Sequence, residues 1–388
     1  MRITTQDAER IVRDGVGLLQ QRRPAEARRR FEQVTATGRA NAQIWALLAT
    51  ACRAMGDRLA EEAAIDRLLA LEPRLARGHI MKADCRAEAG DKGTALGFYR
   101  SALAIASGQQ VPADLLAELK RAEAAAAGIE AELRTRQEAA LAEQGLPREQ
   151  RSPRFQRSLE ILSGQARIFV QEPTAYYFPE LPQIQFYDTA AFSWVPAIEA
   201  ATDDIRRELQ AVLATGLDDF RAYIRSDPNR PRADSNPLLD SRNWSALFLC
   251  ENGQVFEDAV ERCPRTWAAL QSAPLPRIAN SPTAMFSLLR AGARIVPHTG
   301  THNTRLICHL PLIVPPGCAF RVGSETREWE AGKMLIFDDT IEHEAWNGSD
   351  EDRVVLIFDI WRPELTARER EEVAAFFGVP GFQPPPSH

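Results

Sequence analysis

The spacing of small and large apolar residues repeats every 34 positions over the first hundred residues of the chain. Arg22, Gly56 and Gly90 mark the same point in three successive units. Small residues stand seven positions before each mark, and mostly bulky apolar residues stand nine and twelve positions after it. The three columns are Gly15, Ala49 and Ala83, then Phe31, Ile65 and Tyr99, then Val34, Leu68 and Ala102. This agreement favours a repeat over three unrelated amphipathic helix pairs.

A period of about 34 residues with this pattern is typical of tetratricopeptide (TPR) repeats. Small side chains let the two helices of a repeat approach each other, and bulky ones fill the groove left by the next repeat. The stretch 113–143, rich in Ala, Glu and Leu, predicts one or two capping helices, because a terminal repeat needs a polar outer face. A linker signal around Gly145 and Pro147 then predicts TPR-like helical repeats over residues 1–148 and a second domain over residues 149–388.

The composition of the chain changes from about residue 155, where proline and aromatic residues become more frequent. Residues 197–213 predict one amphipathic helix. Beyond Trp244 the chain consists of short apolar runs separated by Gly, Pro and Asn, which predicts an all-β sandwich or barrel. These runs are 245–253, 284–295, 304–314, 318–323, 327–339 and 353–361.

Charge and composition exclude several classes of function. Residues 1–150 hold 23 basic and 21 acidic residues, whereas residues 151–388 hold 24 and 32, a net charge of −8. The acidic half lacks the basic patch of a nucleic-acid binder, so we expect no nucleic-acid partner. The six cysteines show no CxxC spacing, which argues against a zinc ribbon or a redox motif. We see neither an apolar leader nor a membrane-spanning run, and therefore expect a cytoplasmic protein.

Two histidines and an arginine in the β region carry the candidate chemistry. His298 follows a strand-like run, His343 stands 45 residues later, and Arg353 stands ten residues beyond it. This spacing is that of a double-stranded β-helix oxygenase, in which the histidines hold Fe(II) and the arginine binds the far carboxylate of 2-oxoglutarate. Neutral imidazole suits Fe(II), and the guanidinium fork matches a carboxylate. Most such enzymes add a carboxylate ligand two residues after the first histidine, where this chain has Gly300.

Three stretches make the resemblance specific. VPHTGTHNTRLICHLPLIVP, WEAGKMLIFDDTIEHEAWN and RVVLIFDIWRPEL are similar to the core of the aspartyl/asparaginyl β-hydroxylase family. Animal members of that family pair TPR-like repeats with an oxygenase domain, and the family also has glycine where Gly300 stands. The resemblance implies a multidomain α plus β chain: a TPR-like α-solenoid followed by a double-stranded β-helix (jelly-roll, cupin-like) domain.

The resemblance also implies roles for particular residues. His298 and His343 match the iron ligands. The residues that match the cosubstrate pocket are Arg353 and Ser287 for the far carboxylate, His309 for a second contact and Trp244 for the wall. Arg305 matches a basic residue that helps receive an acidic substrate, whereas Ile307 replaces a second one. We therefore expect a weaker preference for acidic substrates.

Several residues allow more than one interpretation. Arg353 could instead form a surface salt bridge with Asp350 or Glu351. Asp338 and Asp339 could cap a turn, or Asp339 could orient an iron-bound water. We expect His302 at the rim of the site. Three tryptophans are expected to fill the core: Trp329, Trp346 and Trp361.

The predicted activity is hydroxylation of a C–H bond in a peptide Asp or Asn side chain or a related substrate. Fe(II), the cosubstrate 2-oxoglutarate and O2 are the implied cofactors, and succinate and CO2 the co-products. Two alternatives remain open: a lipid acyl-chain hydroxylase, and a TPR scaffold with an inert β domain. The repeats predict a protein or peptide partner, since the concave face of a helical solenoid is a binding surface.

Overall fold

The computed structural model describes residues 4–226, 236–278 and 281–379. The chain divides into two compact units, Met1–Leu159 and Glu160–His388. The division falls after residue 148, where the sequence placed the boundary, and lies within helix α8 (Pro153–Leu162).

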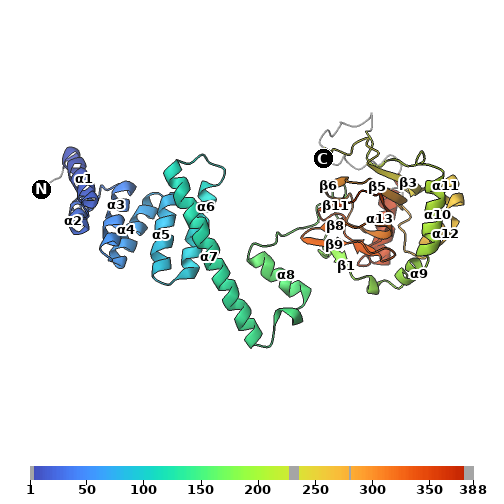
Figure 1. Cartoon of the computed structure of the whole chain (residues 1–388), viewed down its shortest axis with the longest axis horizontal. Coiled ribbons are helices and arrows are strands. Elements are labelled where there is room, and N and C mark those ends of the chain that lie inside the picture. The colour runs from blue at the N-terminus through green and yellow to red at the C-terminus, as the bar shows by residue number, and fades with distance from the viewer. Residues whose placement is uncertain (1–3, 227–235, 279–280, 380–388) are drawn as a thin grey trace. The chain divides into compact units, whose positions relative to one another are not determined.

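The first unit is built from successive antiparallel helix pairs, followed by one long helix (Figure 1). Its helices are α1 (Thr5–Gln20), α2 (Pro24–Thr35), α3 (Ala42–Ala54), α4 (Arg58–Leu71), α5 (Ala76–Glu88), α6 (Lys92–Ala106) and α7 (Ala113–Glu143). Each pair contains one predicted repeat, so the TPR-like arrangement is confirmed. The capping segment is a single helix, α7, with buried Leu119, Ala122, Ala126 and Ile129 beside α5 and α6.

The turn between the helices of each pair explains the first aligned column. Arg22, Gly56 and Gly90 all adopt positive φ, at 59°, 72° and 84°, a conformation that favours glycine. The residues after the two glycines, Asp57 and Asp91, accept hydrogen bonds from backbone N–H groups in the first turns of α4 and α6. The second and third repeats therefore encode the turn and the start of the following helix together, whereas α2 has no side-chain cap.

The remaining columns form the contacts between helices. At Gly15 an added Cβ would lie 2.6 Å from the ring of Phe31, so α1 and α2 cross too closely for a larger residue. Ala49 and Ala83 at the equivalent positions are fully buried, as are Phe31 and Ile65 in the next column. The 34-residue period is therefore a packing period.

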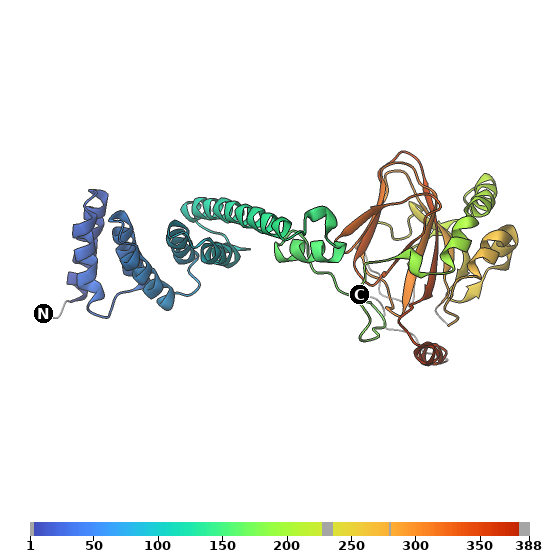
Figure 2. The ribbon, with the colours of Figure 1, turned by 90° about the horizontal axis from the view of Figure 1, so that it is seen from below.

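The second unit contains two antiparallel sheets (Figure 2). In order across the larger sheet, its strands are β1 (Phe186–Tyr187), β10 (Leu335–Phe337), β7 (Arg305–Ile313), β12 (Arg353–Trp361), β5 (Ala284–Leu289), β3 (Trp244–Glu251) and β2 (Arg221–Ala222), with β4 (Gln254–Val255) also paired to β3. The smaller sheet runs β6 (Arg294–His298), β11 (His343–Asn347), β8 (Cys318–Val322) and β9 (Glu325–Glu328). The predicted β architecture is confirmed.

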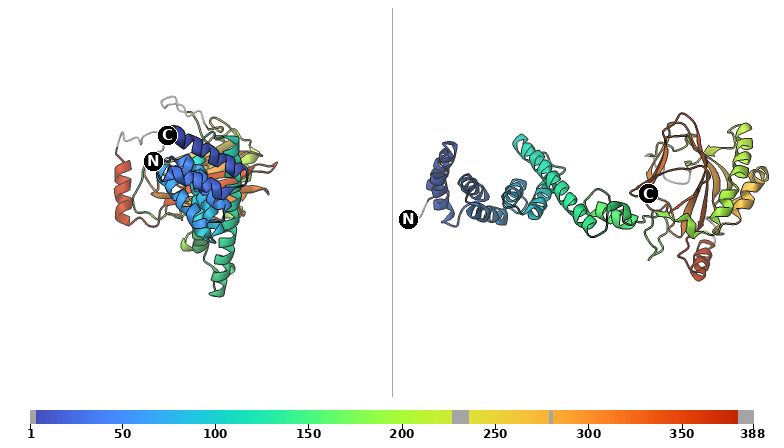
Figure 3. Two further views of the ribbon diagram at one scale, coloured as in Figure 1. Left: turned by 90° about the vertical axis from the view of Figure 1, so that its left-hand side faces the viewer. Right: turned by 60° about the horizontal axis from the view of Figure 1, so that its bottom comes forward.

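Helices cover the outer face of the larger sheet: α9 (Val195–Ala200), α10 (Thr202–Ala214), α11 (Glu257–Arg262) and α12 (Pro264–Leu270). The prediction of one helix over 197–213 was wrong, because α9 and α10 are separate helices that meet at Ala201. Ile198, Ile205 and Leu209 nevertheless face the same core. The last helix, α13 (Ala367–Phe377), lies outside both sheets (Figure 3).

A second core fills the space between the two sheets. Alternating residues of β12 and β5 contribute Val355 and Leu289, and the smaller sheet contributes Phe320, Val322 and Ala345. The predicted site residues point into this same space. The strand alternation that buries one face of the larger sheet beneath the helices therefore turns the other face toward the site.

Candidate active site

The two predicted ligand histidines face each other across neighbouring strands. His298 ends β6 and His343 begins β11, and the two are direct partners in the antiparallel register. Their ring centroids lie 4.1 Å apart. The Nδ1 atom of His298 lies 2.8 Å from the carbonyl oxygen of Val296, and that of His343 lies 3.1 Å from the carbonyl oxygen of Ile341. A carbonyl only accepts, so Nδ1 carries the proton in both rings and Nε2 keeps its lone pair for a metal.

Burial also favours the metal-binding form of both rings. Burial lowers the pKa of His298. Burial holds the pKa of His343 well below its ordinary value, and the neighbouring His298 lowers that pKa as well. Both imidazoles are therefore neutral at neutral pH, as Fe(II) coordination requires. The pair fits a divalent iron that retains several open positions.

A third protein ligand is not provided at Gly300. A Cβ placed there would lie 2.0 Å from Oδ2 of Asp339, so this carboxyl group occupies the space that a side chain at position 300 would need. Within residues 4–226, 236–278 and 281–379, no group of three or more His, Cys, Asp or Glu side chains is arranged to hold a metal. The geometry is that of a two-histidine site with an adjacent buried carboxyl group.

Asp338 and Asp339 have different surroundings. Asp338 caps the turn, since its Oδ1 accepts from the backbone N–H of Thr340 at 3.0 Å. The Asp339 carboxyl group is buried, and its Oδ1 has no hydrogen-bond partner among the described residues. Burial raises the pKa of Asp339 to about 7, although nearby Arg305 acts in the opposite direction. Of the two carboxyl groups, that of Asp339 therefore keeps an oxygen atom without a partner among the described residues.

This raised pKa predicts that Asp339→Asn stabilises the metal-free protein more at pH 8 than at pH 5. The folded pKa of about 7 lies above the ordinary aspartate value of 3.8, so the folded state holds a proton that the unfolded state releases. Stability is then lost as the pH rises through this interval, and asparagine avoids the loss. By linkage the gain in unfolding free energy should grow by roughly 2–3 kcal/mol between the two pH values. Urea unfolding at both pH values measures it, and an equal gain at both would contradict the pKa assignment.

Arg353, at the start of β12, is buried with unused hydrogen-bonding capacity. It is 1% exposed, and its Nε and Nη2 atoms have no hydrogen-bond partner among the described residues. Its Cζ lies 4.6 Å from the ring centroid of Trp329. Burial lowers the pKa of Arg353 to about 10, which leaves it charged at neutral pH. This burial is incompatible with the alternative of a surface salt bridge to Asp350 or Glu351. A buried cation with free donors requires an anionic partner.

Ser287 and Trp244 complete one side of this pocket. Ser287 lies on β5, next to β12, and is fully buried. Its Oγ accepts a hydrogen bond of 3.1 Å from Nε1 of Trp244 and therefore keeps its own proton to donate. The Trp244 ring also lies 6.1 Å from that of His298. Trp244 thus contacts both Ser287 and His298.

His309 forms part of an aromatic wall in the same pocket. Its ring lies 4.8 Å from Phe337 and 5.0 Å from Phe320, and its Nδ1 has no hydrogen-bond partner among the described residues. Burial, with a further contribution from Arg353, holds the pKa of His309 well below its ordinary value. A neutral ring with a free polar atom is suited to a hydrogen bond with the cosubstrate.

Arg305 is already paired. Its Nη1 lies 3.0 Å from Oδ2 of Asp359, and its Nη2 donates to Oγ1 of Thr301 at 3.0 Å. Asp359 is 1% exposed and therefore neutralises the guanidinium at close range. Two positions along the strand, Ile307 packs against the core between the sheets. The sequence analysis expected Arg305 to face an acidic substrate, and no local sequence pattern indicated its ion pair with Asp359.

Three further residues differ from the sequence-based expectations. His302 is not at the rim but buried, with its ring 5.0 Å from that of Phe377. Of the three tryptophans expected in the core, only Trp329 is buried there, and it forms the wall beside Arg353. Trp346 and Trp361 remain partly exposed.

Tyr223 is a site residue that the sequence did not reveal. Its ring centroid lies 4.2 Å from that of Trp244, with the rings tilted by 31°, and it follows β2, which holds only two residues. So short a strand leaves no alternating pattern to recognise.

A separate cavity of about 370 Å³ lies at the edge of the larger sheet. It is lined by Arg221, Phe248, Phe256 and Arg262 among others, and by none of the predicted site residues. Arg221 pairs with Glu251, and Arg262 is likewise paired with an acidic residue, so neither cation is free for a ligand. This cavity is not part of the histidine site.

A comparison with known protein families finds one that matches part of the second unit. Residues 199–363 match the sequence model of a family described as aspartyl/asparaginyl beta-hydroxylase. An ornithine lipid ester-linked acyl 2-hydroxylase from Rhizobium tropici is 40% identical over 182 residues, which cover 46% of this chain and 60% of that protein. The aspartyl/asparaginyl beta-hydroxylase of Mus musculus is 38% identical over 139 residues, or 36% of this chain and 19% of that one. The chain thus spans less than two thirds of either relative.

The helical unit has its own likeness among solved structures. PcrH from Pseudomonas aeruginosa aligns with 33% of this chain and 95% of its own, at 18% identity and a TM-score of 0.31. The second unit has two antiparallel sheets, with the partner histidines His298 and His343 on neighbouring strands of the smaller one. That C-terminal domain belongs to the aspartyl/asparaginyl β-hydroxylase family.

Proposed function

We propose that the C-terminal domain is an Fe(II)- and 2-oxoglutarate-dependent dioxygenase that hydroxylates an unactivated C–H bond. The observation that carries the proposal is the combination of two imidazoles with free Nε2 atoms and a buried arginine with free donors in one space. Bound Fe(II), with 2-oxoglutarate and O2, supplies the oxidising chemistry. One oxygen atom goes to the substrate carbon and the other to succinate, with CO2 released. An inert β domain would have no need of such an uncompensated buried cation.

The residues of this chain bind and orient the reactants. His298 and His343 hold the metal through Nε2. Arg353 and Ser287 donate to the far carboxylate of 2-oxoglutarate, and His309 provides a second contact. Aromatic side chains around them exclude water, which strengthens each charge-assisted hydrogen bond.

The substrate end of the site favours an uncharged, apolar substrate group over an acidic one. Arg305, which would receive an acidic group, is neutralised by Asp359 at 3.0 Å, and Ile307 adds an apolar wall. We therefore propose a lipid acyl chain as the substrate class. The 40% identity to an acyl 2-hydroxylase supports this choice. A peptide Asp or Asn side chain is the second candidate, supported by the family to which the domain belongs. The TPR-like repeats are proposed to bind a protein or peptide partner.

We expect oxidation of an acyl lipid rather than of an acidic peptide. The protein, Fe(II) and 2-oxoglutarate are incubated in parallel with ornithine-lipid vesicles and with an Asp-containing peptide, and mass spectrometry follows the gain of one oxygen atom. Ile307→Arg should shift the preference toward the peptide, because it places an unpaired cation on the wall. Ile313→Arg is the matched control, since Ile313 lies on the same strand but packs against the other core. Oxidation of the peptide alone by the unmodified protein would refute the acyl assignment.

A further inference from the structure

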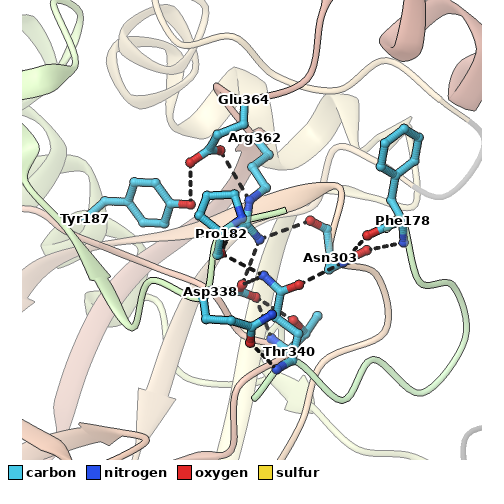
Figure 4. A network of polar contacts seen from close by, with 10 residues as sticks. Phe178, Pro182, Tyr187, Asn303, Asp338, Thr340, Arg362 and Glu364 are labelled. Carbon is cyan, nitrogen blue, oxygen red and sulfur yellow. Dashed lines mark hydrogen bonds and ion pairs between the residues drawn. The ribbon is translucent and has the colours of Figure 1, made fainter. Parts of the chain in front are cut away.

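A buried polar network is centred on Asp338 and Arg362 (Figure 4). At its centre Asp338 is fully buried and accepts four hydrogen bonds. Oδ2 accepts from Nε2 of Gln171 at 2.6 Å and from Nη1 of Arg362 at 2.7 Å. Oδ1 accepts from the backbone N–H and the hydroxyl of Thr340 at 3.0 and 2.6 Å. This carboxylate is fully used within the protein.

Arg362 joins Asp338 to three other parts of the chain. It follows β12 and is fully buried. Its guanidinium also donates to the carbonyl oxygens of Asn303, at 3.2 Å, and Pro182, and its Nε donates to Glu364 at 3.2 Å. One side chain therefore links the end of β12, the loop after His298 and the turn before His343.

The two arginines at the ends of β12 have opposite surroundings. Arg353 keeps two nitrogen atoms without a partner, whereas all three guanidinium nitrogens of Arg362 have partners within the protein. Arg353 is therefore available to a ligand, and Arg362 is not. The function of Arg362 must be exerted through the residues that it holds.

Two of the residues that Arg362 holds, Asn303 and Asp338, are five positions away in the chain from His298 and His343, respectively. Asp338 and Thr340 flank Asp339, whose carbonyl oxygen accepts from the backbone N–H of Gly300 at 2.7 Å. The carbonyl oxygen of Ile341, the residue after Thr340, lies 3.1 Å from Nδ1 of His343. The loop 299–304 and the turn 338–342 lie outside the named strands, so side-chain hydrogen bonds set much of their shape.

Stability alone gives a weak reason for the buried ion pair between Asp338 and Arg362, because apolar residues of similar volume often stabilise a core as well or better. A fully satisfied buried network instead specifies one geometry. We propose that Asp338 and Arg362 are positioning residues that hold the turn 338–342 against the loop 299–304, so that both Nε2 atoms face one metal ion. The proposal rests on the proposed function, because it concerns the iron of that site.

Two variants test the pair without touching a histidine. Thr340→Val removes one hydrogen bond to Asp338, and Arg362→Lys keeps the charge but loses the fork. Co(II), as a spectroscopic substitute for Fe(II), is titrated into each purified full-length protein, and urea unfolding is measured alongside. We expect both variants to bind Co(II) about tenfold more weakly or worse, as is common when groups that orient metal ligands are removed.

Arg321→Lys is the matched control. Arg321 forms ion pairs with Glu342, at 2.8 Å, and Glu344, at 2.5 Å, next to His343, but it is partly exposed. We expect its Co(II) affinity to change by less than about twofold. An equal loss in this control, or unchanged affinity in folded Thr340→Val, would overturn the positioning role. If Arg362→Lys does not fold, Thr340→Val decides. Absence of Co(II) binding by the unmodified protein would instead reject the proposed function itself.

Discussion

Replacing Arg353 by alanine is expected to weaken binding of 2-oxoglutarate by about a hundredfold or more, because truncating one partner of a buried charge pair costs several kcal/mol. The far carboxylate of the cosubstrate would lose its cation at a buried position beside Trp329. Arg353→Lys should be intermediate, since it keeps the charge without the fork. Titration of the Co(II)-loaded protein with 2-oxoglutarate measures the loss, while Co(II) affinity should remain within about twofold, since Arg353 is not a metal ligand.

Arg290→Ala provides the matched control for this prediction. Arg290 lies just beyond β5, close to the same strands, but it is partly exposed and pairs with Asp352 at 2.6 Å. Its removal should leave 2-oxoglutarate affinity unchanged. Equal affinity in Arg353→Ala and the unmodified protein would mean that the buried arginine serves another ligand.

Introducing a carboxylate at the position where related oxygenases carry one should abolish metal binding rather than improve it. In Gly300→Asp the new Cβ would lie 2.0 Å from Oδ2 of Asp339, so the turn that carries Asp339 must move. Such overpacking typically costs about 1–3 kcal/mol and displaces the backbone beside His298. Co(II) titration and unfolding measurements on the purified variant give the two effects separately.

A pair of variants separates the steric conflict from the loss of glycine itself. Gly300→Ala should be impaired in the natural background but should recover Co(II) binding when combined with Asp339→Gly, which removes the clashing carboxyl group. Higher metal affinity and turnover in Gly300→Asp would indicate a decayed three-ligand site and would contradict the two-histidine interpretation.

The sequence was sufficient for the features that depend on local periodicity. The TPR-like repeats followed from columns such as Gly15 and Phe31, whose close contact is the physical origin of the period. The β strands followed from short apolar runs between turn residues. The boundary at Ala201 was missed, because Ile198 and Ile205 continue one apolar face across the break.

The pairings within the site were beyond such reasoning, because they join residues far apart in the chain. Arg305 and Asp359 are 54 positions apart, and Gln171 and Asp338 are 167 apart. No local pattern records that Arg305 is neutralised. Trp329 was expected in the core, where it lies, but its place against Arg353 depends on how the segment after β9 packs against the start of β12. The identities of His298, His343 and Arg353 came from spacing and resemblance, and their roles as ligands stay predictions.

The central claim is that this domain turns over 2-oxoglutarate at a two-histidine iron site. The most direct measurement is formation of succinate from 2-oxoglutarate by the unmodified full-length protein under air, with and without added Fe(II). We predict slow Fe(II)-dependent succinate formation without a prime substrate, matched by CO2 release and accelerated by the lipid that the site accepts. A protein that binds Fe(II) and 2-oxoglutarate but forms no succinate with any acyl lipid or acidic peptide would contradict the account.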